Sequence, residues 1–180
     1  MLRLIIAAPL AAVALFSAVP ATAQSGRTPP PPVEAATREA QPYLFHAGAS
    51  DVFEITSSQM AIMRSRDPEV RRYATMLIDH HTRTTNLALA AARQAGVTPP
   101  PPVLTPQQRS FIDRIANLSG PDFDRAYAEV QVPAHQAALA VHSGYASNGD
   151  TPQLQTVARG AVPIVQRHLE GAQRLQARTR

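Results

Sequence analysis

Histidine is the residue type in this sequence best suited to chemistry. The chain has no cysteine, which excludes thiolate nucleophiles, thiolate metal ligands and disulfides. Neutral imidazole, in contrast, is a good ligand for zinc, copper, iron and nickel. The six histidines are His46, His80, His81, His135, His142 and His168. The question is whether the fold brings several of these rings together.

Their spacing suggests a metal centre if the chain forms a four-helix bundle with a long crossover. Glu54, His81 and His135 then lie near mid-height on three helices, and His168 lies at the same level on the fourth. Metal sites in bundles are built in this way, from side chains on facing helices. The spacing predicts a transition-metal site, for zinc, copper or iron, made by these four residues.

The position of each residue around its helix bears on this prediction. His81 and His168 fall within apolar stripes, whereas His135 lies on the flank of its stripe. Glu54 lies nearly opposite the strongest stripe of its helix, which weakens it as a ligand. The alternative for His81 and His168 is a core histidine hydrogen-bonded to a neighbouring helix. The alternative for His46, His80 and His142 is a surface position.

Methionine offers a second kind of ligand, because thioethers bind copper. Met60, Met63 and Met76 are the candidates, although methionine at helical spacing is more often core filler.

Motifs of known enzymes are missing from the sequence. It has no Glu-x-x-His of di-iron bundles and no His-Glu-x-x-His of metalloproteases. It also lacks a phosphate-binding glycine loop and a nucleophile elbow. We therefore expect a protein that binds rather than catalyses, and an atypical oxidase or stress protein is an alternative.

The elements that must position these residues are helices. Apolar residues recur at three- and four-residue spacing, and no strand-like alternation occurs, which predicts an all-α fold. Four long helices are expected, together with a short one at 106–118. The long helices span about 43–66, 68–95, 121–147 and 151–178.

Several residues mark where these helices begin and end. Asp67 and Thr105 are suited to cap helices that start at the prolines following them, and Gly96 is suited to end one. Pro133 and Pro163 fall inside the last two long helices, so each helix is expected either to kink or to split in two.

The connection between the second and third long helices determines the topology. It contains four consecutive prolines, for which an extended polyproline conformation is expected, followed by the short helix. At ~3.1 Å per residue the proline segment spans roughly 25 Å. The short helix adds roughly 20 Å at 1.5 Å per residue. Together they match the roughly 40 Å of the second helix, so this crossover can run the full length of a ferritin-like bundle.

The two ends of the chain differ from the bundle. Residues 1–23 carry one arginine, an apolar run and the small-x-small pattern Ala21-Thr22-Ala23, which predicts a secretory signal peptide cleaved after Ala23. Residues 24–42 are rich in proline and poor in bulky apolar residues, so we expect a disordered leader. The bundle domain is expected over 43–178, with no second segment apolar enough to span a membrane.

The charge pattern does not favour nucleic acid as a partner. All 17 basic side chains are arginine, against 13 acidic ones, and the arginines are scattered among acids rather than grouped. An envelope partner fits export better.

Four ordered runs of the sequence resemble the domain of unknown function 4142 family (DUF4142). They are DVFEITSSQMA at 51–61, VRRYATMLIDHHT at 70–82, FDRAY at 123–127 and PIVQRHL at 163–169. The resemblance implies an exported bacterial bundle of ferritin-like fold, periplasmic or secreted, without a settled activity.

Site residues also follow from this resemblance. It implies a glutamate in the first helix, matched by Glu54, and histidines matched by His135 and His168. It also implies a histidine in the second helix, matched by His81 or, as the alternative, by its neighbour His80. It does not establish a metal. An envelope module that binds no metal, with these histidines as core groups, remains the alternative function.

Overall fold

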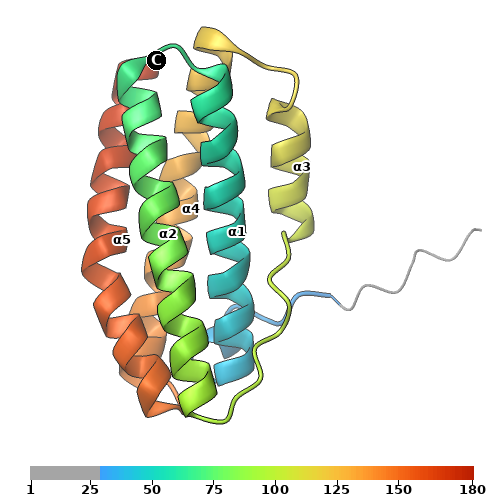
Figure 1. Ribbon diagram of the computed structural model, residues 1–180, viewed down its shortest axis with the longest axis vertical. Coiled ribbons are helices and arrows are strands. Elements are labelled where there is room, and N and C mark those ends of the chain that lie inside the picture. Colours follow the sequence, from blue (N-terminus) through green and yellow to red (C-terminus); the bar gives the residue numbers. More distant parts are fainter. Residues whose placement is uncertain (1–28) are drawn as a thin grey trace, which may run out of the picture.

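The computed structural model describes residues 29–180, and these form a bundle of four long helices with a fifth, shorter helix beside it (Figure 1). The predicted all-α class is confirmed, because this part of the chain contains helices and no strand. The elements are the short 3-10 helix η1 (Ala35–Thr37) and the helices α1 (Ala40–Arg64), α2 (Pro68–Gln94), α3 (Pro106–Ile115), α4 (Gly120–Asn148) and α5 (Pro152–Thr179).

The helix starts and stops follow the local chemistry expected from the sequence. At the start of α2 the side chain of Asp67 accepts a hydrogen bond from the backbone N–H of Glu69. At the start of α3 Thr105 and Gln108 form a capping box, each side chain bonding the other's backbone N–H. Gly96, just past α2, has a φ of 68°, a conformation that costs glycine little.

The topology contains the predicted long crossover. Every pair of adjacent long helices is antiparallel, whereas α2 and α4 run in the same direction (Figure 1). The chain leaves the lower end of α2 in that view, passes along the outside of α1 through α3, and re-enters the bundle at the upper end of α4. The most extensive contacts are between α4 and α5, followed by those between α1 and α2.

The two internal prolines do not split their helices. Pro133 lies within a continuous α4 and Pro163 within a continuous α5, and both side chains are exposed. A proline on the solvent face leaves the unpaired carbonyl one turn earlier accessible to water, which limits its cost.

The expectation of an unstructured leader is wrong for residues 35–42. Ala36 is fully buried, and α1 already begins at Ala40. The Asp150 backbone N–H donates to the Arg38 carbonyl at 2.9 Å, and the Asp150 side chain accepts from the Ala40 N–H at 3.3 Å. These contacts tie the segment to the turn between α4 and α5. The predicted signal peptide and cleavage point, and residues 24–28, lie outside the described residues.

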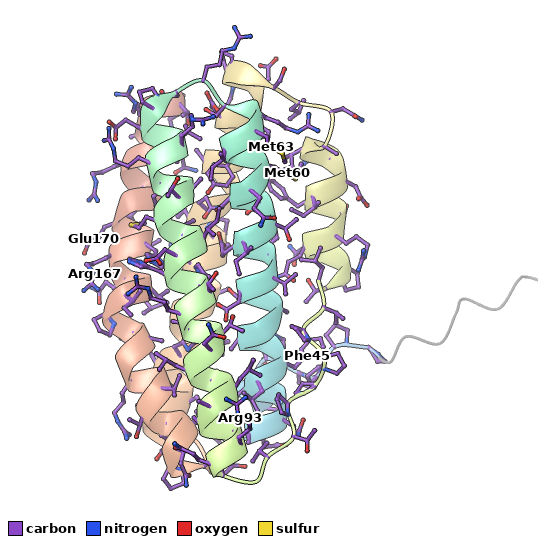
Figure 2. All side chains as sticks on the ribbon, in the orientation of Figure 1. Phe45, Met60, Met63, Arg93, Arg167 and Glu170 are labelled. Atoms are coloured by element: carbon purple, nitrogen blue, oxygen red, sulfur yellow. The ribbon has the colours of Figure 1, made fainter. Side chains whose placement is uncertain are left out.

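The spacing of Phe45, Ala49, Val52, Thr56, Met60 and Met63 predicts one apolar stripe of α1 that faces the bundle, and this prediction is wrong in part. Met63 is 73% exposed, and the buried face of α1 carries Tyr43, Glu54 and Ala61 instead. The reason is that α1 has a second covered side, along the crossover. Phe53 packs on Phe111 of α3 with ring centroids 5.6 Å apart, and Met60 lies between α1 and α3 (Figure 2).

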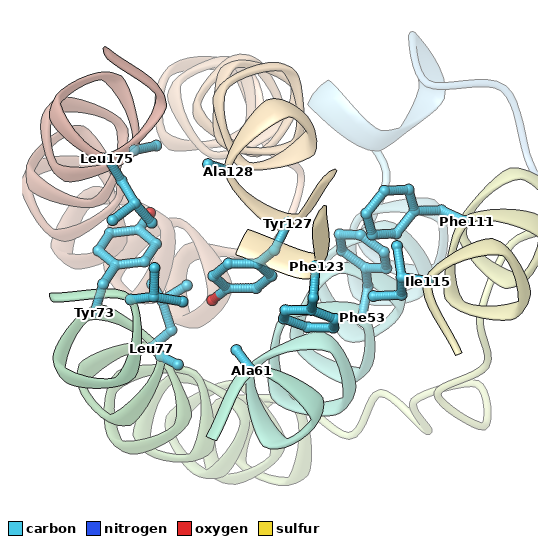
Figure 3. Packing of buried hydrophobic residues seen from close by; sticks show 13 residues of the cluster. Phe53, Ala61, Tyr73, Leu77, Phe111, Ile115, Phe123, Tyr127, Ala128 and Leu175 are labelled. Carbon is cyan, nitrogen blue, oxygen red and sulfur yellow. The ribbon is translucent and has the colours of Figure 1, made fainter. Parts of the chain in front are cut away.

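The core consists of two apolar clusters, one towards each end of the bundle. The cluster near the α1–α2 connection contains Tyr73, Leu77, Phe123 and Tyr127, which interleave between the helices (Figure 3). The other cluster is built around Tyr43, Tyr145 and Leu154 among others. Within residues 29–180 no helix is long and apolar enough to cross a membrane.

Candidate metal centre

Three of the predicted site residues meet in the interior of the bundle. His81 of α2, His135 of α4 and His168 of α5 are 4%, 1% and 1% exposed. One ring nitrogen of each lies within 4.8 Å of those of the other two. The ring centroids are 5.3 to 6.0 Å apart. The three histidines lie at the same height along their helices, as the sequence predicts, and their rings meet in the core.

Each of these rings has one nitrogen with no hydrogen-bond partner. The unpaired atoms are Nε2 of His81, Nε2 of His135 and Nδ1 of His168, all buried. Buried polar atoms in folded proteins are nearly always paired, so three such atoms in one group require an explanation. Converging imidazole lone pairs are what a metal ion binds.

The other nitrogen of each ring is hydrogen-bonded. Nδ1 of His81 bonds Oδ1 of Asp51 at 2.8 Å, and Nδ1 of His135 donates to the Gln131 carbonyl at 2.8 Å. Nε2 of His168 lies 2.7 Å from Nδ1 of His80. Histidine ligands usually donate their second N–H to a carboxylate, a carbonyl or another acceptor, which fixes the tautomer and orients the ring.

Asp51 is itself held in place by α2. Thr84 donates to its Oδ1 at 3.4 Å and Thr85 to its Oδ2 at 2.6 Å. The carboxylate is buried, at 8% exposure. Sequence reasoning missed this residue, although Asp51 precedes Glu54 by one helical turn, so the two carboxylates share one face of α1.

Glu54 is close to the three histidines but is not one of the converging group. It is 1% exposed, with Oε1 3.9 Å from Nδ1 of His135 and Oε2 buried without a partner. The prediction that Glu54 lies away from the core is therefore wrong. The error followed from assigning the apolar stripe of α1 to the bundle side.

The remaining histidines lie in other surroundings. His80 is partly buried between α2 and α5, beside the centre. His142 is buried, so the expected surface position is wrong, and its Nδ1 lies 3.1 Å from the hydroxyl of Tyr43. His46 is partly buried, and its Nε2 lies 2.8 Å from the Pro31 carbonyl. The sulfur candidates do not join the centre either, since Met60 and Met76 pack against the apolar cluster.

The electrostatics keep two of the three rings neutral. Burial, followed by the charges of the neighbouring histidines and Arg167, lowers the pKa of His168 to about 2. Burial also lowers the pKa of His135, and Glu54 opposes this only in part. For His81 burial acts in the same direction, but the hydrogen bond and charge of Asp51 outweigh it and raise the pKa. A cation at the centre would thus compete with a proton at His81 alone.

Together the fold and these residues define a class: a four-helix bundle protein with a cluster of histidines in its core. Residues 25–175 match the family described as domain of unknown function (DUF4142), and the chain belongs to this family. No curated protein matches the sequence.

Two solved structures share the fold. One is CopM in the Cu(II)-bound form, with 16% identity and a TM-score of 0.66, over 78% of this chain and 97% of that chain. The other is CopM in the Ag-bound form, with 18% identity and a TM-score of 0.63, over 76% and 93% of the two chains. At this level of identity the likeness establishes the fold.

Proposed function

We propose that this protein binds a transition-metal ion in the core of its bundle, with copper preferred, through His81, His135 and His168. The observation that carries the proposal is a group of three buried histidines, each of which offers one ring nitrogen within 4.8 Å of the others and has one ring nitrogen without a hydrogen-bond partner. A structural role alone would leave three polar atoms unsatisfied in the core, at a cost of about 1–3 kcal/mol for each.

The distances fit an ion after small side-chain movements. Imidazole nitrogens bind at about 2.0–2.1 Å, so the nitrogens of a tetrahedral site lie about 3.4 Å apart. The three nitrogens here lie within 4.8 Å of one another. Rotation of the rings about their side-chain bonds would close this difference.

The charge of the surroundings also fits a divalent ion. The carboxylates of Asp51 and Glu54 are both buried beside the histidines, and Oε2 of Glu54 has no partner. A buried carboxylate is costly unless a positive charge accompanies it. One divalent ion with three neutral imidazoles balances the two negative charges, so Glu54 supplies counter-charge next to the ligands.

Copper is preferred on two grounds. Nitrogen ligands bind Cu²⁺ more tightly than the other divalent first-row ions. The two solved structures of similar fold contain Cu(II) and silver. Zinc and iron are the competing ions that imidazole ligands also accept.

The proposed role is binding rather than catalysis, in the periplasm. The three histidines are at most 4% exposed, so they do not face a site open to a substrate. The signal-peptide pattern at 1–23 supports export of the chain.

Elemental analysis by plasma mass spectrometry tests the proposal. The mature chain from Gln24 onward, purified without a histidine tag, is compared with His81→Ala and His168→Ala. His46→Ala is the matched control, since it removes a histidine that lies outside the centre. About one copper per chain in the wild type and the control, and none in the two variants, supports the proposal. No metal in the wild type after incubation with copper, zinc or iron refutes it.

A further inference from the structure

His80 links the buried centre to the surface. Its Nδ1 lies 2.7 Å from Nε2 of His168, and the two rings stack with centroids 5.0 Å apart and an angle of 15° between their planes. The other nitrogen of His168, Nδ1, is the buried atom without a partner. His168 therefore contacts His80 with one nitrogen and keeps the other buried and free for an ion.

The other groups bonded to the three rings cannot serve as a route for an ion. Asp51, on His81, is buried behind Thr84 and Thr85. The partner of His135 is a backbone carbonyl within α4. Among the described side chains bonded to these rings, His80 is the one that reaches solvent.

We propose that His80 and His168 form an access dyad, a pair of imidazoles that takes a metal ion from solvent and passes it to the buried centre. This inference rests on the proposed function of that centre. At 2.7 Å the two nitrogens share one proton. A metal ion taken up here would be held by Nδ1 of His80 and Nε2 of His168, and the proton between them would leave to water.

The transfer inward is a ligand exchange with no change of oxidation state. In such an exchange Nδ1 of His80 and Nε2 of His168 would both release the ion, and Nδ1 of His168 and Nε2 of His81 and of His135 would take it up. A proton from water would then return to Nε2 of His168 and restore its hydrogen bond to His80. The exchange favours the interior because two imidazoles are replaced by three and the buried carboxylate of Glu54 gains a counter-charge. His80 thus lies on the path of the ion and is not one of its final ligands.

Stopped-flow kinetics with Cu(II) buffered by glycine tests the dyad. Association is followed by copper absorbance and dissociation by competition with a chelator, in wild type, His80→Gln and His80→Phe. The phenylalanine variant retains an aromatic ring to stack on His168 while removing the nitrogen. His46→Gln is the matched control, again a partly buried histidine outside the centre.

We expect the association rate to fall about tenfold or more in both His80 variants. The copper content per chain at saturating copper stays the same, because the three final ligands are intact, while the lost hydrogen bond to His168 weakens the affinity less in His80→Gln, whose amide can still accept it, than in His80→Phe. Unchanged rates, or weaker affinity with an unchanged association rate, overturn the access role while the buried site stands. Failure of the wild type to bind copper refutes the proposed function and, with it, the dyad.

Discussion

Asp51 and His81 join α1 to α2 through a hydrogen bond of 2.8 Å between Oδ1 and Nδ1, in the interior of the bundle. The bond fixes the proton of the neutral ring on Nδ1 and leaves the lone pair of Nε2 unpaired, beside His135 and His168. A carboxylate behind a histidine in this way raises its basicity and orients it as a ligand.

Replacing Asp51 with asparagine should therefore weaken copper binding about 10–100-fold. The amide can still accept a hydrogen bond, but it lacks the charge that increases the electron density of the ring. Titration against a competing chelator measures the change. Asp113→Asn, at an exposed position on α3, is the control and should bind like the wild type. Equal affinity of the Asp51 variant would mean that the carboxylate serves only to join the helices.

The apolar cluster beside the centre should determine much of the stability. Leu77 is fully buried, so Leu77→Ala should lower the free energy of unfolding by about 2–5 kcal/mol. Leu87 lies on the same helix and is 58% exposed, so the same substitution there should change it by less than about 0.5 kcal/mol. Urea unfolding of the metal-free proteins compares the two. Similar losses at both sites would contradict the observed burial of this face of α2.

Local chemistry made most of the fold predictable from the sequence. Caps such as Asp67 and Thr105, and the stop at Gly96, act through neighbouring backbone groups and need no knowledge of the rest of the chain. The inward face of α1 was not predictable in this way. Its apolar residues serve two surfaces, since Phe53 packs on α3, and periodicity does not distinguish a surface facing the bundle from one facing the crossover.

The sequence could predict only the part of the site that depends on the height of each residue along its helix. His81, His135 and His168 share a level, and the structure brings them together. The role of Asp51 depends on where α1 faces α2, and the role of His80 depends on how α2 faces α5. Both are relations between helices, and the sequence contains no direct signal for either.

Acid should destabilise the protein in part through His142. Burial lowers the pKa of this ring to about 4, with Asp51 opposing and His81 adding to the effect. The unfolded chain, with a pKa near 6.5, binds a proton first as the pH falls. The part of the folding stability that depends on a neutral His142 is therefore fully present above about pH 6.5 and is lost progressively down to about pH 4.

A comparison of urea unfolding at pH 7 and pH 4.5 checks this pH dependence in metal-free protein. Between pH 7 and pH 4.5 the free energy of unfolding should fall in both proteins. The fall should be about 2–3 kcal/mol smaller in His142→Gln than in the wild type. His46→Gln removes a histidine that is not buried in the core, and should lose as much as the wild type. Parallel losses in all three proteins would show that His142 is not held neutral by the fold.

Glu54 should have opposite effects in the metal-free and metal-bound proteins. Its carboxylate is buried, with Oε2 unpaired, so its charge destabilises the metal-free core and stabilises a bound cation. Glu54→Gln should therefore raise the free energy of unfolding of metal-free protein at pH 8 by about 1–3 kcal/mol. The same variant should show a smaller gain in stability on adding copper, because the gain follows the affinity of the folded state for the ion. Glu129→Gln, at an exposed position on α4, should change neither quantity. If the Glu54 variant proves less stable without metal, the carboxylate has a structural partner within the bundle, and the argument that it supplies charge to an ion fails.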